Sequence, residues 1–150
     1  MPDLKDLYQE AVLDHYKRPR NFGKPERANR SAEGFNPLCG DKLSIFLFIE
    51  NGIIRDTGFT GTGCAISIAS ASMMTESLKE KTEAEARIVS RRFHQLLTEP
   101  ADALPDLECM GDLAAFSNLR EYPVRVKCAR LAWHTMLAAI EERQETISTE

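Results

Sequence analysis

The chain has 150 residues, of which 43% are hydrophobic and 28% charged, a balance typical of a globular protein and not of a disordered one. Its 19 Lys and Arg against 23 Asp and Glu give a net charge of -4, which disfavours a nucleic-acid partner. The opening residues lack the basic end and apolar core of a secretion signal, and no apolar run approaches the roughly 20 residues of a membrane helix. We therefore expect a cytoplasmic protein with no membrane segment, in which cysteine thiols stay reduced.

The first part of the chain predicts a helix followed by a long connection. Residues 3–17 have apolar side chains at helical spacing, and Pro19 ends the pattern. The segment from there to Asn36 is rich in Pro, Gly, Asn, Arg and Lys, which indicates irregular structure with a short strand around Ala28–Glu33. A connection of this length is often functional.

The middle of the chain predicts a β-hairpin. Leu43–Glu50 is the clearest strand, Asn51-Gly52 is a type I′ turn signal, and Ile53–Thr60 should return antiparallel to the first strand. Three glycines are expected to loosen the chain just before Cys64: Gly58, Gly61 and Gly63.

The second half predicts mainly helices. The expected elements are a helix over 65–79, a helix over 82–97, an acidic loop between Pro100 and Pro105, a helix or turn over 109–119, and a terminal helix over 123–143. The tail 144–150 is polar and expected to fray. We find no internal repeat and no second-domain boundary, so residues 1–150 are expected to form one domain.

A group of cysteines and one aspartate is the chemical centre of the sequence. In Asn36-Pro-Leu-Cys-Gly-Asp41, Cys39 and Asp41 lie two residues apart on a tight turn. Cys64 and Cys128 each lie where a helix should begin, a position that favours thiolate over thiol. Three thiols and one carboxylate make four possible ligands, the number that a tetrahedral zinc site requires. Thiolates also bind iron–sulfur clusters. The spacing alone does not prove that the three regions meet.

Other reactive residues have simpler interpretations. Cys109, between Glu108 and Met110, resembles a buried free cysteine that acts as a small hydrophobe. His15 is expected to pack against or cap the first helix and not to bind metal. The serines of the 65–79 helix have no base at motif spacing, which disfavours a serine hydrolase.

Four stretches of sequence together carry a family resemblance. They are Leu13-Asp-His-Tyr-Lys-Arg-Pro-Arg-Asn-Phe-Gly23, Asn36-Pro-Leu-Cys-Gly-Asp41, Gly63-Cys-Ala-Ile-Ser67 with Ala69-Ser-Ala-Ser-Met-Met-Thr75, and Val126-Lys-Cys-Ala129. With these the sequence resembles the SufU-type proteins, relatives of the IscU scaffold and of the N-terminal part of NifU. The resemblance implies an α+β fold, a small and mainly antiparallel sheet covered by several helices. It also implies that Cys39, Asp41, Cys64 and Cys128 surround one metal at the edge of the molecule.

Two features favour the SufU branch over the IscU branch. IscU-like scaffolds assemble a [2Fe–2S] cluster and usually have His immediately before the third cysteine, where this chain has Lys127. SufU-like proteins have Lys there and an extra segment before the last helices, which Lys81–Leu107 would supply.

The resemblance implies zinc-dependent sulfur transfer. In that branch a PLP-containing, SufS-type cysteine desulfurase passes persulfide sulfur to the zinc protein, and the sulfur moves on to downstream cluster-assembly proteins. A histidine of the desulfurase replaces one cysteine ligand, by resemblance Cys39, which becomes the sulfur acceptor and thus the catalytic residue. Arg125 and Lys127 would steer the partner or the persulfide. The alternatives are a scaffold that assembles a [2Fe–2S] cluster, and a structural zinc domain that acts only as an adaptor.

Overall fold

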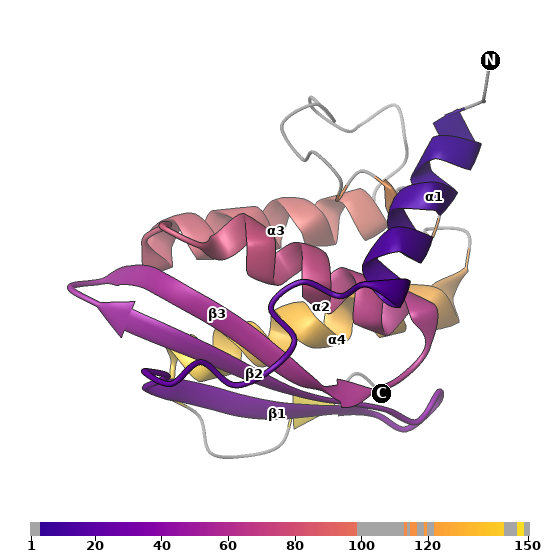
Figure 1. Cartoon of the computed structure of the whole chain (residues 1–150). Coiled ribbons are helices and arrows are strands. Elements are labelled where there is room, and N and C mark those ends of the chain that lie inside the picture. Colours follow the sequence, from indigo (N-terminus) through magenta and orange to yellow (C-terminus); the bar gives the residue numbers. More distant parts are fainter. Residues whose placement is uncertain are drawn as a thin grey trace.

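The computed structural model describes residues 4–98, 113, 115–116, 119, 122–142 and 147–148 of the chain, with side chains from residue 10 to 142 within those ranges. Its helices are α1 (Leu4–Lys17), α2 (Ala65–Leu78), α3 (Glu83–Thr98) and α4 (Pro123–Ile140). Its strands are β1 (Arg30–Asn36), β2 (Asp41–Glu50), β3 (Ile53–Thr62) and β4 (Ile147–Ser148). Figure 1 shows the helices on one side of a single sheet. The α+β fold expected from the sequence is therefore confirmed.

The sheet has the strand order β3-β2-β1-β4. β1, β2 and β3 form an antiparallel meander, while β4 pairs in parallel with β1. The β2–β3 turn has positive φ at both central residues, 54° at Asn51 and 76° at Gly52, as a type I′ turn requires. The hairpin predicted from this dipeptide is thus confirmed.

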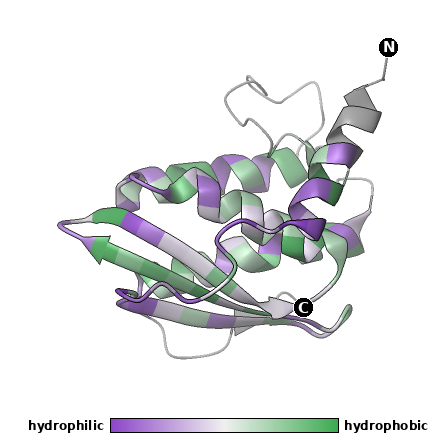
Figure 2. Cartoon of the chain, in the orientation of Figure 1, coloured by the Kyte–Doolittle hydropathy of each residue, from purple (hydrophilic) through white to green (hydrophobic). Residues whose placement is uncertain are grey.

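The core lies between the sheet and the helices. Side chains of β2 alternate along the strand, and Leu43, Ile45 and Leu47 are fully buried on the face that α4 covers. α2 contacts β3 and α4, and α3 packs on α4. Figure 2 shows hydrophobic stretches on the strands and on the helices above them. This packing fixes the start of β2 relative to the first turns of α2 and α4.

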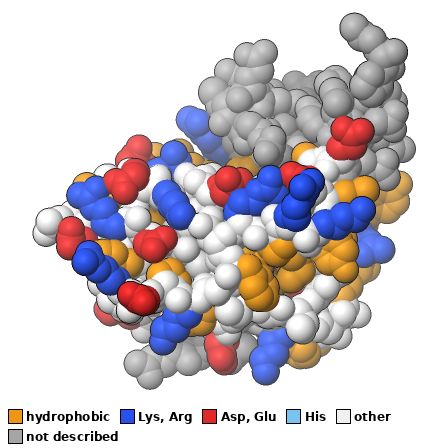
Figure 3. Space-filling model, viewed as in Figure 1, with side chains coloured by type: hydrophobic (Ala, Val, Ile, Leu, Met, Phe, Trp, Pro, Cys, Tyr) orange, Lys and Arg blue, Asp and Glu red, His pale blue; other side chains and the backbone are white. Residues whose placement is uncertain are grey.

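The connection after α1 runs along the outer side of the sheet. It bonds to β3, where the Gly23 amide donates to the Phe59 carbonyl at 2.7 Å, and Lys24 and Arg27 lie over the rings of Phe46 and Phe48 of β2. Figure 3 shows positive and negative side chains interspersed on this side, with hydrophobic ones between them. The long segment is therefore a cover for the outer face of the sheet.

His15 ties α1 to α2. It is 3% exposed, and its Nδ1 lies 2.7 Å from the Ser72 hydroxyl, which also accepts a hydrogen bond from the Arg20 amide at 2.8 Å. The other ring nitrogen, Nε2, lies 3.7 Å from the Glu76 carboxylate. The prediction that His15 has a packing role agrees with these contacts. Much of the Leu13–Gly23 stretch around it thus attaches α1 and the connection to α2.

Several predicted boundaries differ from the structure. The short strand expected at 28–33 is a longer one that ends at Asn36, and the terminal helix ends at Ile140 instead of residue 143. Within the tail that we expect to fray, Ile147 and Ser148 pair with β1 as strand β4. The predicted loop between Pro100 and Pro105 lies outside the described residues, and so does Cys109. Among the helices of the described ranges, none has the length and apolar character that crossing a membrane requires.

Candidate metal centre

Three separate regions of the chain meet at one end of the sheet. Cys39 lies in the turn between β1 and β2, and Asp41 is the first residue of β2. Cys64 immediately precedes α2, and Cys128 lies in the second turn of α4. The β2–β3 hairpin is antiparallel, so the end of β3 and the start of α2 lie beside Asp41 at the start of β2. α4 covers β2 and adds Cys128 to this end of the sheet.

The ligand atoms of these residues lie close together. One sulfur each from Cys39 and Cys128 and one oxygen from Asp41 lie within 4.8 Å of one another. The two sulfur atoms are 3.2 Å apart, and the Cys64 sulfur lies 4.0 Å from Asp41 Oδ2. Cys64 therefore lies next to Asp41, but its sulfur is not within 4.8 Å of all three of the other ligand atoms.

The four side chains differ in exposure. Asp41 and Cys128 are fully buried, Cys64 is half-buried, and Cys39 is exposed. The turn that carries Cys39 is closed by a hydrogen bond from the Gly40 amide to the Asn36 carbonyl at 2.8 Å. Gly40 has a φ of 74°, a conformation for which glycine is the usual residue. One thiol thus faces solvent from a tight turn while the other donors lie inside.

Asp41 joins the strand to α2. Its Oδ1 accepts a hydrogen bond from the Cys64 amide at 2.8 Å. A Cβ atom on Gly63 would lie 2.7 Å from the same oxygen, so only glycine allows the carboxylate to approach the chain this closely. The expectation that Gly63 loosens the chain is therefore wrong, because Gly63 lets the chain pack closely against Asp41.

Asn36 is a residue of the centre that the sequence analysis did not assign. It is fully buried, and its amide nitrogen donates to Asp41 Oδ2 at 3.3 Å and to the Cys128 sulfur at 3.4 Å. Its Oδ1 accepts from the Leu38 amide at 3.3 Å, which fixes the orientation of the side chain. The signal in the sequence was its place at the head of the turn motif, directly before Pro37. Asn36 therefore holds Asp41 and Cys128 together from inside the protein.

The position of Cys64 before α2 has the effect expected for a helix N-terminus. Its sulfur accepts from the Ser67 amide at 3.5 Å, as an N-cap side chain does. Hydrogen bonding with Cys128, together with the amides of Ser67 and Ile66, lowers the pKa of Cys64 to about 6, against the opposing effects of burial and the Asp41 charge. The thiolate that the sequence predicted at this helix start is thus favoured.

Cys128 behaves in the opposite way. Its interaction with the Cys64 thiolate, its burial and its contact with Cys39 all raise the pKa of Cys128 above the ordinary value. The neighbouring Cys64 and the burial of Cys128 thus act against the thiolate that we expect at the start of α4.

The donor set fits a thiophilic metal ion. In a tetrahedral site with Zn–S bonds of about 2.3 Å, two sulfur ligands are roughly 3.8 Å apart. The sulfur atoms of Cys39 and Cys128 are closer than this, at 3.2 Å. The Cys64 sulfur and Asp41 Oδ2 are 4.0 Å apart, further than the roughly 3.6 Å between a sulfur and an oxygen ligand of one zinc ion. Thiolates suit zinc and iron–sulfur clusters, and a carboxylate is an accepted fourth ligand for zinc. The site can hold such an ion with small adjustments of side chains.

Residues 7–147 match the family model of the NifU-like N-terminal domain. The chain belongs to the NifU-like N-terminal domain family. Its relatives within this family carry names of both the SufU and the IscU type.

Three similar proteins cover nearly the whole chain of this NifU-like protein. The zinc-dependent sulfurtransferase SufU of Bacillus subtilis (strain 168) is 34% identical, over 95% of this chain and 95% of the relative. The iron–sulfur cluster assembly scaffold protein IscU of Thermotoga maritima is 34% identical, over 93% of this chain and 96% of the relative. A crystal structure of a protein described as a cluster assembly scaffold for the SUF system, from Fervidobacterium islandicum AW-1, superposes with a TM-score of 0.80 at 32% identity, over 92% of this chain and 99% of that one.

Replacing Asn36 with alanine should weaken zinc binding by this NifU-like protein about 10- to 100-fold, the usual effect of losing a partner that orients a metal ligand. The substitution removes the donor shared by Asp41 and Cys128 while leaving all four candidate ligands in place. Competition with a chromophoric chelator measures the affinity. Asn29→Ala is the matched control, because the side chain of Asn29 bonds to the backbone of Ile49 and not, among the described residues, to a member of the centre. Equal zinc affinities of the two variants would contradict a role for Asn36 at the centre.

Proposed function

We propose that the chain is a zinc-dependent sulfur-relay protein that accepts persulfide sulfur from a PLP-dependent cysteine desulfurase and passes it to iron–sulfur cluster assembly. The observation that carries this proposal is the asymmetry of the centre. The exposed Cys39 thiol lies 3.2 Å from the buried Cys128 thiol and within the same small group as the buried Asp41. A centre with one accessible thiol suits transfer to and from another protein better than a purely structural ion does.

Asp41, Cys64 and Cys128 would hold the metal together with Cys39. When bound, zinc keeps its cysteine ligands deprotonated at neutral pH. Asp41 is anchored by the Cys64 amide and by Asn36, so its carboxylate keeps its position when Cys39 moves. Cys128 is fixed within α4 and Cys64 at the start of α2. The three inner donors would thus stay in place while the outer one reacts.

The proposed transfer is a thiol–disulfide type of exchange without net oxidation. The Cys39 thiolate attacks the terminal sulfur of the desulfurase persulfide, and a new S–S bond forms on Cys39. The S–S bond of the donor breaks, and the donor cysteine leaves as a thiolate with the electron pair of that bond. Cys39 then carries the persulfide, and the same reaction with an acceptor thiol returns it to the thiolate.

The surroundings of Cys39 suit docking of a partner. Leu38, next to Cys39, is 58% exposed, although leucine is usually buried. At the start of α4, Tyr122 and Val124 are 57% and 51% exposed, and Arg125 beside them is also exposed. Apolar side chains with a nearby positive charge would contact a partner surface that carries carboxylates, and Arg125 and Lys127 would steer its approach.

The alternative is a scaffold on which a [2Fe–2S] cluster is assembled. It is favoured by the relatives named IscU and by the fact that thiolates bind clusters as well as zinc. Lys127 favours the relay, because IscU-type scaffolds usually have a histidine at the position where this chain, like SufU-type proteins, has a lysine.

The deciding experiment uses a PLP-dependent cysteine desulfurase with the chain zinc-loaded or metal-free. The relay predicts that alanine release from cysteine rises with the zinc-loaded chain alone and that the chain gains one sulfur atom per molecule by mass spectrometry. Anaerobic addition of iron and sulfide, followed by visible absorbance, tests the scaffold in parallel. No stimulation together with a stable coloured cluster would replace the relay by the scaffold.

A further inference from the structure

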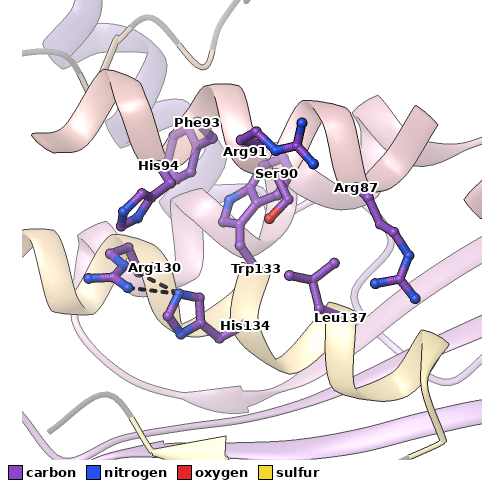
Figure 4. A pocket seen from close by; sticks show the side chains of 9 residues that line it. All are labelled: Arg87, Ser90, Arg91, Phe93, His94, Arg130, Trp133, His134 and Leu137. Carbon is purple, nitrogen blue, oxygen red and sulfur yellow. Dashed lines mark hydrogen bonds between the residues drawn. The ribbon is translucent and has the colours of Figure 1, made fainter. Parts of the chain in front are cut away.

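A second site lies between α3 and α4 and shares no residue with the metal centre. It is a pocket of about 390 Å³, within the usual size range of small-molecule sites. Figure 4 shows that its side chains come from the facing sides of the two helices. Phe93 and Trp133 stack at its base with ring centroids 4.8 Å apart, and Leu137 adds apolar surface. The pocket thus has a rigid apolar floor.

The pocket has an excess of positive charge. Arg87, Arg91 and Arg130 all line it, and no carboxylate appears among its lining residues within the described part of the chain. Arg87 forms an ion pair with Glu141 at 3.0 Å. For Arg91 and Arg130 no carboxylate partner lies within ion-pair distance among the described residues. Within the part of the chain that the structure describes, two guanidinium charges at this pocket therefore have no carboxylate partner.

Arg130 is held in position by a neutral neighbour. Its Nε and Nη2 lie 3.3 Å and 3.0 Å from Nε2 of His134, one turn further along α4. Burial, together with the charge of Arg130, lowers the pKa of His134 to about 4, so the imidazole is neutral at pH 7 and its Nε2 accepts from the guanidinium. The histidine orients Arg130 and leaves its charge available for an anion.

We propose that this pocket binds a small organic phosphate, with the phosphate group held by Arg130 and attracted by Arg91, and with the apolar part over Leu137 and the floor. A phosphate monoester carries a charge of about -1.5 to -2 at pH 7, which matches the charge of the two guanidinium groups. Guanidinium groups form strong paired hydrogen bonds with phosphate oxygens. The volume of the pocket and its apolar floor favour an organic ester over inorganic phosphate.

Trp133 gives a direct readout, because it is the one tryptophan of the chain and lies at the base of the pocket. Phenyl phosphate, titrated into the full zinc-loaded chain, should change Trp133 fluorescence with a Kd below about 1 mM, a value in line with the efficiency of small ligands. Inorganic phosphate lacks the ring and benzyl alcohol lacks the charge, so each should bind at least about 10-fold more weakly. Benzoate, with one charge, should bind with an affinity between those of phenyl phosphate and benzyl alcohol.

Arg130→Gln should raise the Kd for phenyl phosphate by at least about 10-fold, because it removes a charge-assisted hydrogen bond. Arg91→Gln should raise it by about 3-fold and carries the test if the Arg130 variant does not fold, since Arg91 is exposed. Arg55→Gln is the matched control, because Arg55 lies in β3 and pairs with Glu80 at 2.7 Å. Benzyl alcohol binding as tightly as phenyl phosphate, or unchanged affinity in both pocket variants, would overturn the proposal. Neither result would bear on sulfur transfer at Cys39.

Discussion

Replacing Cys39 with alanine should reduce sulfur acceptance from a cysteine desulfurase by at least about 100-fold, because no other thiol of the centre is exposed to attack a persulfide. The fold should survive, since the side chain lies at the surface in a turn whose closing hydrogen bond uses only backbone atoms. Zinc binding should weaken without disappearing, because Asp41, Cys64 and Cys128 remain. Mass spectrometry of the chain after one desulfurase turnover measures the persulfide, and elemental analysis measures the zinc.

Cys64→Ala is the matched cysteine variant. It removes an inner donor and the side chain that accepts from the Ser67 amide, so it should lower both zinc content and stability, the latter by about 1 kcal/mol. Its Cys39 thiol remains in place. Persulfide found on Cys64 in the Cys39→Ala chain would contradict the assignment of Cys39 as the acceptor. A chain that gains no sulfur even with Cys39 in place, and that loses only stability in the Cys39→Ala variant, would favour the structural adaptor.

The fold was largely predictable wherever side-chain patterns are local. The alternation in β2 and the Asn51-Gly52 turn specified the hairpin, and Pro123 marked the start of α4. These signals need only neighbours in sequence, so the corresponding elements were placed to within a few residues. Their agreement with the structure shows how strongly a turn dipeptide and a period of two constrain an antiparallel pair.

The edge of the sheet was less predictable because its signals depend on distant partners. The inward residues of β1 are Ala32, Gly34 and Asn36, which do not make the apolar alternation of a typical strand. They are small or polar because α4 lies close to the strand: a Cβ on Gly34 would come 2.0 Å from the Thr135 hydroxyl oxygen. The pairing of β4 with β1 likewise joins residues more than 100 positions apart. Such contacts leave no periodic pattern in either segment.

The structure brings Cys39, Asp41 and Cys128 together and places Cys64 beside Asp41, but the contacts among these residues were not predictable from the sequence. The motif containing Cys39 and Asp41 and the two helix starts named the four donors. The sequence could not show that Asp41 is bonded to the Cys64 amide, or that Asn36 donates to both Asp41 and Cys128. It also could not show that Cys39 alone of the three described thiols is exposed. Those features arise from the way β2, α2 and α4 pack together.

Replacing Gly61 with alanine should lower the free energy of unfolding by about 3–5 kcal/mol, the sum of backbone strain and a steric clash with strand β2. Gly61 has a φ of 146°, which side-chain-bearing residues rarely adopt. An added Cβ would lie 2.1 Å from the Lys42 carbonyl oxygen and 2.9 Å from the Leu43 Cα. Both obstacles are backbone atoms of the paired strand, so the change cannot be absorbed by turning a side chain. Denaturant unfolding followed by circular dichroism measures the loss.

Gly52→Ala separates the two contributions to this loss. Gly52 also has a positive φ, 76°, but no atom lies within 4 Å of its added Cβ, so strain alone should cost about 1–2 kcal/mol. Gly61 pairs with Leu43, two residues after Asp41, and a forced separation of β2 from β3 at that point would move the carboxylate away from the Cys64 amide. Zinc affinity should therefore fall in Gly61→Ala and stay unchanged in Gly52→Ala. Equal stabilities of the two variants would mean that the strands do not approach each other this closely, and the tight link between the hairpin and the metal centre would be wrong.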